Sequence, residues 1–470
     1  MKKFYLSTPI YYANDKPHIG TVYTSIAADI LARWHRQRGE KVYFQTGVDE
    51  HGAKMVKAAQ MAGFDSPKAF CEHQVVFFQR VLRQLDITED YFIRTTNPDH
   101  ERFVQQFLTE LKNKGEIYKG TYRGLYCLGC EEFKDPSELV NGLCPLHQSK
   151  PEEITEENYF FRLSHYQDKL LRLIESDKML VEPKERRNEI LSFLKTQKLK
   201  DISISREKVI WGIPLPWDKK QTVYCWVDAL LNYLSGGLEF WPCDLHLIGK
   251  DILKFHTVLW PALLLANGYP PPKRVFAHGF FTLEGKKISK TYGNIIYAEE
   301  AIQRYGSDVV RFYLFRTIPF GQDGDFSEEN LKARYNADLA NGLGNLVQRV
   351  SHLVAKEHQG RLSQIKTTAS LREFELPKIR KQYQQALEAL RFDQALDLVF
   401  GLVEKANQYI EKYRVWQKDQ NQPIHLAKLV QLLKEVGEGL AIFMPQTAAK
   451  MEKQFQGPKI PPPTPLFPRR

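Results

Sequence analysis

The order of apolar and turn-forming segments in the first fifty residues is the feature that most limits the fold. Phe4 to Ile10 is apolar and rich in aromatic residues, which is typical of a buried strand, and Asn14 to Pro17 has the composition of a turn. Val22 to Trp34 then carries apolar residues at helical spacing, and Lys41 to Thr46 has the composition of a second strand. A strand, a helix and a strand in this order predict a parallel, doubly wound α/β sheet that binds a nucleotide.

The rest of the chain divides into an interrupted sheet and a helical region. Gly115 to Cys144 is rich in Gly, Tyr and Cys and has the character of an insertion, whereas Leu346 to Gly439 is helical throughout. Pro461 to Pro465 is expected to be a polyproline II segment. The remaining expected elements are helices at Ser66 to Leu85 and His100 to Lys114, and strands at Thr222 to Trp226, Leu245 to Gly249 and Arg274 to Phe281.

Composition excludes several classes of protein. The chain has 470 residues, of which 43% are hydrophobic, so it can bury several cores. It contains no run of 18 apolar residues, and Pro9 interrupts the N-terminus before a signal-peptide core could form, so we expect neither a membrane span nor secretion. Six cysteines are too few for a disulfide framework, and three of them lie within eighteen positions, which indicates metal binding in a reducing, cytoplasmic compartment.

The formal net charge of +10 is concentrated near the C-terminus. From Leu346 to Arg470 there are 20 Lys and Arg against 12 Asp and Glu. Such an excess is typical either of a solvated helical surface or of a surface that binds a polyanion. The charge alone leaves both interpretations open.

Two short segments have the chemistry of phosphate binding. His18 and Gly20 stand at the first turn from strand to helix, where free amides and the helix dipole favour an anion, His18 can donate a hydrogen bond and Gly20 allows close approach. Far downstream, Lys287 and Lys290 lie in a short lysine-rich segment, Glu284 to Thr291, whose charges could gather on a triphosphate as its α-phosphate is attacked. Each segment by itself is a weak signal.

Together these segments resemble the two signatures of the class I aminoacyl-tRNA synthetases, HIGH and KMSKS. The first is present as His18-Ile19-Gly20-Thr21 and the second as Lys287-Ile288-Ser289-Lys290-Thr291, in the expected order. Thr21 replaces the second histidine of the first signature, which puts the contribution of that position to ATP binding in question. The resemblance implies that ATP binds at His18, Gly20, Lys287, Ser289 and Lys290.

Within this class the chain is similar to the methionyl-tRNA synthetase family. The similar segments are Thr8 to Asn14, Thr46 to Gly52, Trp226 to Tyr233, and Ile248 to Ile252 with His256. The resemblance implies a methionine pocket in which Asp49 pairs with the substrate ammonium and aromatic residues contact the thioether. The implied pocket residues are Ile10, Tyr12, Asp49, Trp226, Ala229, Tyr233, Ile252 and His256.

The insertion contains a set of metal ligands. Cys127 and Cys130 form a C-x2-C pair, and after thirteen residues Cys144 and His147 form a C-x2-H pair. Three thiolates and one imidazole at this spacing predict one closed, structural Zn²⁺ site. The family carries such a knuckle in its connective insertion. Cys71, Cys225 and Cys243 have no paired spacing and are expected to be packed or surface thiols.

The resemblance also implies that the basic helical region reads the anticodon of tRNA(Met). Asn345, Arg349 and Trp416 match the family's positions for this role, and an exposed tryptophan can stack on an unpaired base. The predicted fold is therefore a Rossmann-like doubly wound parallel sheet, split by a zinc-knuckle connective insertion and followed by an all-α anticodon-binding bundle. The expected segments are 1–115 and 222–270 for the two halves of the catalytic domain, 116–221 for the insertion, 271–345 for the KMSKS loop and linking region, 346–460 for the bundle and 461–470 for the proline-rich tail.

The implied activity is that of a methionine–tRNA ligase. Methionine is activated by ATP, with Mg²⁺ accompanying the nucleotide, and is transferred to the 3′ end of tRNA(Met). We expect a cytoplasmic monomer. Two alternatives remain open at this stage, namely a class I synthetase for another amino acid such as cysteine or leucine, and a catalytically silent paralogue that only binds tRNA.

Overall fold

The computed structural model describes residues 2–283, 286–287, 295–361, 371–457 and 459–468. The chain separates into two compact units, which are considered one at a time. Unit 1 consists of residues 1–83 and 87–278, and unit 2 of residues 84–86 and 279–470. None of the described helices is long and apolar enough to cross a membrane.

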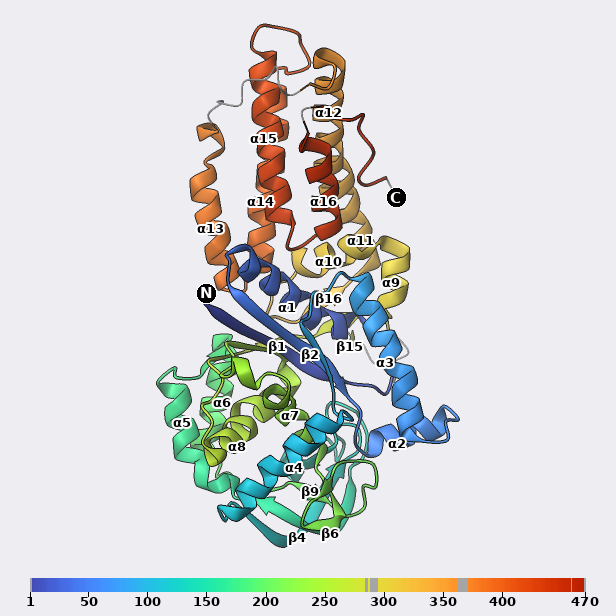
Figure 1. Ribbon diagram of the computed structural model, residues 1–470, viewed down its shortest axis with the longest axis vertical. Coiled ribbons are helices and arrows are strands. Elements are labelled where there is room, and N and C mark those ends of the chain that lie inside the picture. Colours follow the sequence, from blue (N-terminus) through green and yellow to red (C-terminus); the bar gives the residue numbers. More distant parts are fainter. Residues whose placement is uncertain (1, 284–285, 288–294, 362–370, 458, 469–470) are drawn as a thin grey trace. The chain divides into compact units, whose positions relative to one another are not determined.

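Unit 1 is built on the parallel sheet that the sequence predicts (Figure 1). Its strand order is β3-β2-β1-β12-β13-β7, and every neighbouring pair is parallel. The order reverses direction at β1, so the carboxyl ends of β1, β2 and β12 meet where nucleotides bind in open α/β sheets. The strands are β1 (Lys3–Tyr12), β2 (Lys41–Asp49), β3 (Tyr91–Arg94), β7 (Leu180–Glu182), β12 (Leu245–Gly249) and β13 (Arg274–His278).

The helical segments predicted for unit 1 match observed helices to within a few residues at each end. Helix α1 (Ile19–Gln37) begins three residues before the predicted start, because the side chain of His18 accepts hydrogen bonds from the first free amides. Helix α4 begins after Asn97, whose side chain accepts from the Asp99 amide. The other helices of this unit are α2 (Ala53–Met61), α3 (Pro67–Gln84), α4 (Pro98–Asn113), α5 (Gln167–Glu175), α6 (Lys184–Thr196), α7 (Cys225–Ser235) and α8 (Trp260–Asn267).

One prediction about the sheet is wrong. The segment Thr222 to Trp226 does not return to the parallel sheet: its first residues end β11 (Asp218–Val223), which is antiparallel to its neighbours, and its last residues begin helix α7. A short apolar run fits a buried strand and a buried helix equally well, so periodicity could not separate them. The edge strand β7 comes from within the segment assigned to the insertion and pairs with β13.

The insertion contributes two small sheets. Its main sheet has the order β5-β4-β6-β8 and is antiparallel, with β4 and β6 paired from Ile117–Phe161 to Tyr126–Glu152. The zinc-ligand segment follows β4 directly. The strands are β4 (Ile117–Cys127), β5 (Glu132–Lys134), β6 (Glu152–Phe161), β8 (Ile202–Ser203), β9 (Ser205–Arg206), β10 (Pro214–Leu215) and β11.

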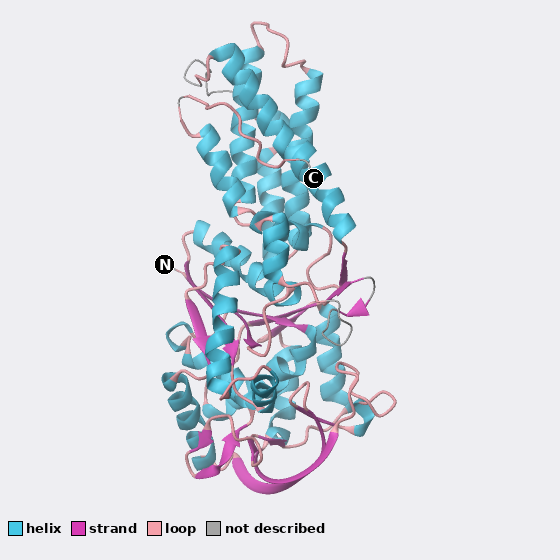
Figure 2. Cartoon of the chain, turned by 90° about the vertical axis from the view of Figure 1, so that its right-hand side faces the viewer, coloured by secondary structure: helices cyan, strands magenta, loops and turns pink. Residues whose placement is uncertain are grey.

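Unit 2 is mainly helical, as predicted for its C-terminal part. It includes a small sheet, β15-β14-β16, and long helices, of which α13, α14, α15 and α16 each contact the next. Figure 2 shows that the region before the C-terminus is almost entirely helical. A π-helical segment, Tyr335–Gly344, leads into α12. The elements are β14 (Phe281–Leu283), β15 (Lys286–Lys287), β16 (Gly324–Phe326), α9 (Ala298–Tyr305), α10 (Ser307–Arg316), α11 (Glu328–Arg334), α12 (Asn345–His358), α13 (Leu376–Glu388), α14 (Phe392–Lys412), α15 (Gln422–Leu440) and α16 (Pro445–Phe455).

Candidate functional site

The carboxyl ends of β1 and β2 bring three of the predicted pocket residues together. In the parallel register Tyr12 pairs with Asp49, and Ile10 pairs with Gly47. Gly47 is required there, because a Cβ atom would lie 2.1 Å from the carbonyl oxygen of Ile93. A buried carboxylate therefore stands beside a tyrosine at the edge of the sheet where ligands bind.

Helix α7 supplies an apolar wall opposite these strand ends. Trp226, Ala229 and Tyr233 follow one another at helical spacing on one face. The Trp226 ring stacks on Phe255, with 4.0 Å between ring centroids and an interplanar angle of 7°, and meets the Tyr12 ring edge to face at 6.3 Å. Tyr12 of the sheet and Trp226 of helix α7 are therefore in contact. The resemblance assigned both residues to the methionine pocket.

A hydrogen-bonded chain fixes the far side of this wall. The Nδ1 atom of His256 lies 2.9 Å from the carbonyl oxygen of Ile252 and must donate to it, so Nε2 accepts from the Tyr233 hydroxyl at 2.8 Å. Burial lowers the pKa of His256 to about 4, so the ring is neutral at pH 7. The site thus presents a neutral imidazole and a tyrosine ring, which suit an uncharged, weakly polar ligand group.

Asp49 is the acidic group of this region. Burial raises its pKa well above the ordinary value, and the charges of Asp228 and Glu131 raise it further. The amide of His51 donates to Asp49 Oδ1 at 3.3 Å, which opposes the rise. A cationic ligand group beside Asp49 would oppose the rise in pKa that burial and the acidic neighbours cause, and so favour the ionised carboxylate.

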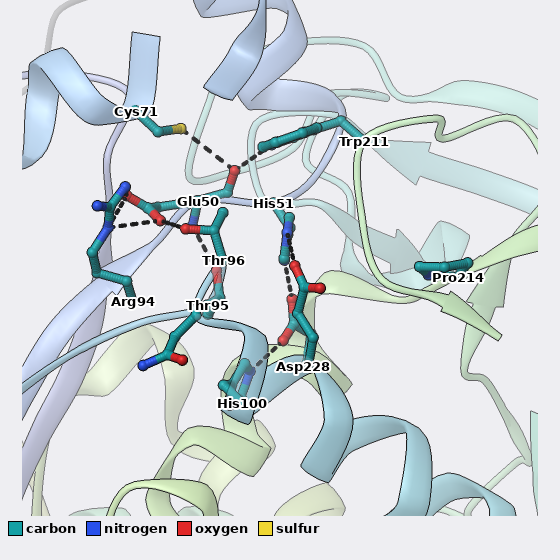
Figure 3. A network of polar contacts seen from close by, with 12 residues as sticks. Glu50, His51, Cys71, Arg94, Thr95, Thr96, His100, Trp211, Pro214 and Asp228 are labelled. Atoms are coloured by element: carbon teal, nitrogen blue, oxygen red, sulfur yellow. Dashed lines mark hydrogen bonds and ion pairs between the residues drawn. The ribbon is translucent and has the colours of Figure 1, made fainter. Parts of the chain in front are cut away.

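Sequence reasoning assigned no role to a second buried carboxylate, Asp228 (Figure 3). Asp228 Oδ2 lies 2.7 Å from His51 Nδ1, and Asp228 Oδ1 lies 2.7 Å from His100 Nε2. The other ring nitrogen of His100 lies 2.7 Å from Ser235 Oγ. One carboxylate therefore joins helix α7 to helix α4 and to the segment after Asp49. The signal in the sequence was an acidic residue inside an apolar helix.

Glu50 holds the same segment from its other side (Figure 3). Its buried carboxylate forms an ion pair with Arg94 at 2.8 Å and accepts a hydrogen bond from Thr96. Its carbonyl oxygen accepts from the indole of Trp211 and from the thiol of Cys71. The segment that carries Asp49 is thus anchored to β3, α3 and the loop after β9.

The predicted phosphate site at α1 has a defined histidine tautomer. His18 Nδ1 accepts from the amides of Gly20 at 3.1 Å and Thr21 at 3.4 Å. Because Nδ1 is an acceptor, the proton of the neutral ring lies on Nε2, which can then donate. A Cβ atom at Gly20 would lie 3.0 Å from the His18 ring, so a small residue suits this turn.

The second predicted phosphate segment lies largely outside the described residues. The backbone of Lys287 belongs to β15 and pairs with Thr282 of β14. Ser289 and Lys290 are not among the residues that the structure describes. Their assignment to ATP remains a prediction.

The four predicted metal ligands converge within the insertion. The ligand atoms of Cys127, Cys130, Cys144 and His147 all lie within 4.8 Å of one another. Cys130 Sγ lies 3.6 Å from Cys144 Sγ and 3.2 Å from His147 Nδ1. A Cβ atom at Gly129 would lie 2.5 Å from the His147 ring, so the C-x2-C loop has room for that ring only with glycine there. This set of three thiols and one imidazole fits a tetrahedral Zn²⁺ ion.

In unit 2 the three predicted anticodon residues are at least partly accessible. Asn345 is exposed at the start of α12, and Arg349 is half-buried one turn later. Arg349 Nη2 lies 2.8 Å from Glu411 Oε1 in the last turn of α14, and Trp416 follows five residues after Glu411. Trp416 is 44% exposed, so it is not a fully buried core residue.

Comparisons with known proteins agree with this arrangement. A family model described as tRNA synthetases class I (M) matches residues 4–150 and 130–351. The chain is 45% identical over 431 residues to the methionine–tRNA ligase of Thermotoga maritima, covering 88% of this chain and 68% of that protein. It is 42% identical to that of Caldanaerobacter subterraneus, covering 97% of this chain and 74% of that protein. It also matches Mycobacterium tuberculosis methionyl-tRNA synthetase in complex with methionyl-adenylate, with a TM-score of 0.93, 35% identity and full coverage of both chains.

Proposed function

The chain belongs to the class I tRNA synthetases of the methionyl type, and from this membership we propose how its own residues share the work of a methionine–tRNA ligase. Such a ligase joins methionine to ATP to form methionyl-adenylate and pyrophosphate, and then transfers the methionyl group to tRNA. The observation that carries the proposal is the position of the buried Asp49 beside Tyr12 at the carboxyl ends of β2 and β1. A carboxyl group that a cationic ligand would ionise therefore lies next to aromatic side chains at the edge of the sheet where ligands bind.

Methionine binds between the strand ends and helix α7. Asp49 pairs with the α-ammonium, and Tyr12 and Trp226 contact the aliphatic part of the side chain. Tyr233 and the neutral His256 meet the sulfur, which is a weak acceptor that pairs well with aromatic edges and hydroxyl groups. Ile10, Ala229 and Ile252 complete the apolar surface.

ATP binds at the start of α1 and at the lysine-rich segment. His18 Nε2–H donates to a phosphate oxygen, and Gly20 permits close approach. Lys287, Ser289 and Lys290 hold the triphosphate, and Mg²⁺ accompanies the nucleotide. A methionine carboxylate oxygen attacks the α-phosphorus in line, the new P–O bond forms, and the bond to pyrophosphate breaks. These residues act by positioning and by stabilising charge in the transition state, so no general base is assigned.

The tRNA anticodon is read by the helical region of unit 2. Trp416 stacks on an unpaired base, and Asn345 and Arg349 contact base edges. When tRNA binds, the Arg349 side chain leaves its ion pair with Glu411 and contacts the base instead. The ribose at the 3′ end of the tRNA then attacks the carbonyl carbon of methionyl-adenylate and releases AMP.

The remaining assignments concern the metal, the compartment and the assembly. We assign one structural Zn²⁺ to Cys127, Cys130, Cys144 and His147, where the metal would cross-link the two halves of the knuckle. The cysteine spacing, with a metal-ligand set and no paired spacing for the other three, supports a reducing compartment, the cytoplasm. We assign a monomer, which sedimentation velocity would test.

The test of the proposed function is ATP–pyrophosphate exchange measured with several amino acids on one preparation. Methionine-dependent exchange is expected, with cysteine and leucine at background. Exchange with another amino acid instead would identify a different class I synthetase. No exchange with any amino acid, in protein that still binds tRNA, would identify a silent paralogue.

A further inference from the structure

Glu131 has no role in the function proposed so far, although its surroundings are unusual. It follows the metal ligand Cys130 directly, and its backbone has a left-handed conformation with φ of 53°. Its side chain is fully buried. A buried carboxylate is costly unless it is paired or hydrogen-bonded, so its contacts indicate what it does.

The Glu131 carboxylate caps helix α2 from a distant part of the chain. Its Oε1 atom accepts from the amide of Lys54 at 2.9 Å, across 77 residues of sequence. The residue before α2, Gly52, has φ of 108° and offers no side chain to cap the helix. A Cβ atom at Gly52 would lie 2.4 Å from Glu131 Oε1, so the carboxylate packs directly on this backbone. An anion here is favoured by the free amides and by the helix dipole.

The capped helix follows Asp49 by only four residues, so this cap also fixes the segment that carries the proposed ammonium ligand. On the other side of that segment, Glu50 and His51 are tied to Arg94 and Asp228. At its far end, Glu131 accepts from the Lys54 amide, and the Gly52 amide donates to the carbonyl oxygen of Trp211 at 3.0 Å. Loss of the cap would allow the Asp49 side chain to move, while leaving the Asp228 contacts in place.

The residues beside Glu131 contact both walls of the methionine pocket. The carbonyl oxygen of Cys130 accepts from the indole of Trp226 at 3.1 Å, and that of Glu131 accepts from the Tyr224 hydroxyl at 2.7 Å. Lys54 Nζ lies 3.3 Å from the carbonyl oxygen of Gly129 and 4.3 Å from the centroid of the Tyr12 ring. The loop 129–131 therefore contacts Trp226 directly and is linked to Tyr12 through the Lys54 side chain.

We propose that Glu131, carried by the zinc-knuckle loop, is a positioning residue for methionine, because its carboxyl group caps α2 and so holds Asp49 in place. This inference rests on the proposed function of Asp49. The knuckle loop then forms part of the amino-acid site and does more than stabilise the insertion.

The test compares Glu131→Gln and Glu131→Ala with the matched control Glu153→Gln, an exposed glutamate of the same insertion that pairs with Arg123. Methionine affinity is measured by calorimetry, and the KM values for methionine and ATP by ATP–pyrophosphate exchange. Glu131→Ala is expected to weaken methionine binding about tenfold and Glu131→Gln about threefold, because the amide can still accept from Lys54 but carries no charge. The KM for ATP, the kcat at saturating methionine and all values of Glu153→Gln should change less than about twofold.

Two results would overturn the inference. One is a folded Glu131→Gln or Glu131→Ala protein that binds methionine within about twofold of the wild type. The other is an equal loss of ATP and methionine affinity, which would indicate general disorder of the unit. If Glu131→Ala does not fold, the isosteric Glu131→Gln decides alone. Absence of methionine-dependent exchange in the wild type would instead defeat the proposed function, so the two failures are distinguishable.

Discussion

Replacing Asp228 by Asn should destabilise unit 1 more than most single substitutions. The carboxylate is 1% exposed and lies 2.7 Å from ring nitrogens of both His51 and His100. Removing one partner of a buried charged group costs about 3–5 kcal/mol, since the remaining groups lose their compensation. Relief of the repulsion between Asp228 and Asp49 offsets a part of this cost. With about 2–4 °C lost per kcal/mol in a large domain, the thermal midpoint should fall by roughly 6–20 °C, less the part that this relief offsets.

The pH dependence of this loss follows from the two pKa shifts. Burial alone would lower the pKa of His51, but the charge of Asp228 raises it above the ordinary 6.5. The stabilisation from the charged His51 beside Asp228 is complete below pH 6.5 and is lost as pH rises through the pKa of His51 in the folded protein. Burial would raise the pKa of Asp228, but His51 and His100 hold it below the ordinary 3.8, so its contribution is present above 3.8 and is lost as pH falls through the folded pKa. The difference between wild type and variant should therefore be largest between pH 3.8 and 6.5.

Thermal melting followed by circular dichroism at pH 5.5 and pH 8.5 would measure both effects. The control is Asp177→Asn, which removes an exposed partner of Arg187 and should shift the stability by less than about 0.5 kcal/mol. A folded Asp228→Asn protein that melts within about 2 °C of the wild type at pH 5.5 would refute the reasoning. An equal difference at both pH values would refute the part assigned to His51.

Three further predictions concern the other assignments. Trp416→Ala should reduce kcat/KM for tRNA charging about 5- to 150-fold and leave ATP–pyrophosphate exchange unchanged, since a base–aromatic stack contributes about 1–3 kcal/mol; normal charging would remove Trp416 from the anticodon site. Metal analysis should find about one zinc per chain, and Cys127→Ser should lower the thermal midpoint, because a structural metal contributes to folding directly; a zinc-free protein of equal stability would disprove the metal site. Lys290→Ala should slow adenylate formation by about 100-fold or more while methionine affinity barely changes, since its charge is needed in the transition state; an unchanged rate would exclude Lys290.

The sequence was sufficient wherever a local pattern carries the chemistry. The spacing of Cys127, Cys130, Cys144 and His147 predicted a metal-ligand set, and the four ligand atoms do converge. The alternation of strand and helix in the first fifty residues predicted the parallel sheet. Tyr12 and Asp49 were grouped by the family resemblance alone, and the parallel register pairs them as the last residues of β1 and β2.

The contacts between distant segments were decided only by the tertiary structure. In the sequence Glu131 is one acidic residue next to a cysteine, and acidic residues are usually exposed, yet here it is fully buried and caps a helix 77 residues away. In the sequence Asp228 is likewise a single acidic residue within an apolar helix. No neighbouring residue indicates that it pairs with His51 and His100. The assignment of Val223 to β11 and Cys225 to α7 depended on packing as well, because a short apolar run is compatible with both elements. Local patterns fix which groups are present, whereas burial and pairing depend on which distant residues the folded chain brings within hydrogen-bond distance.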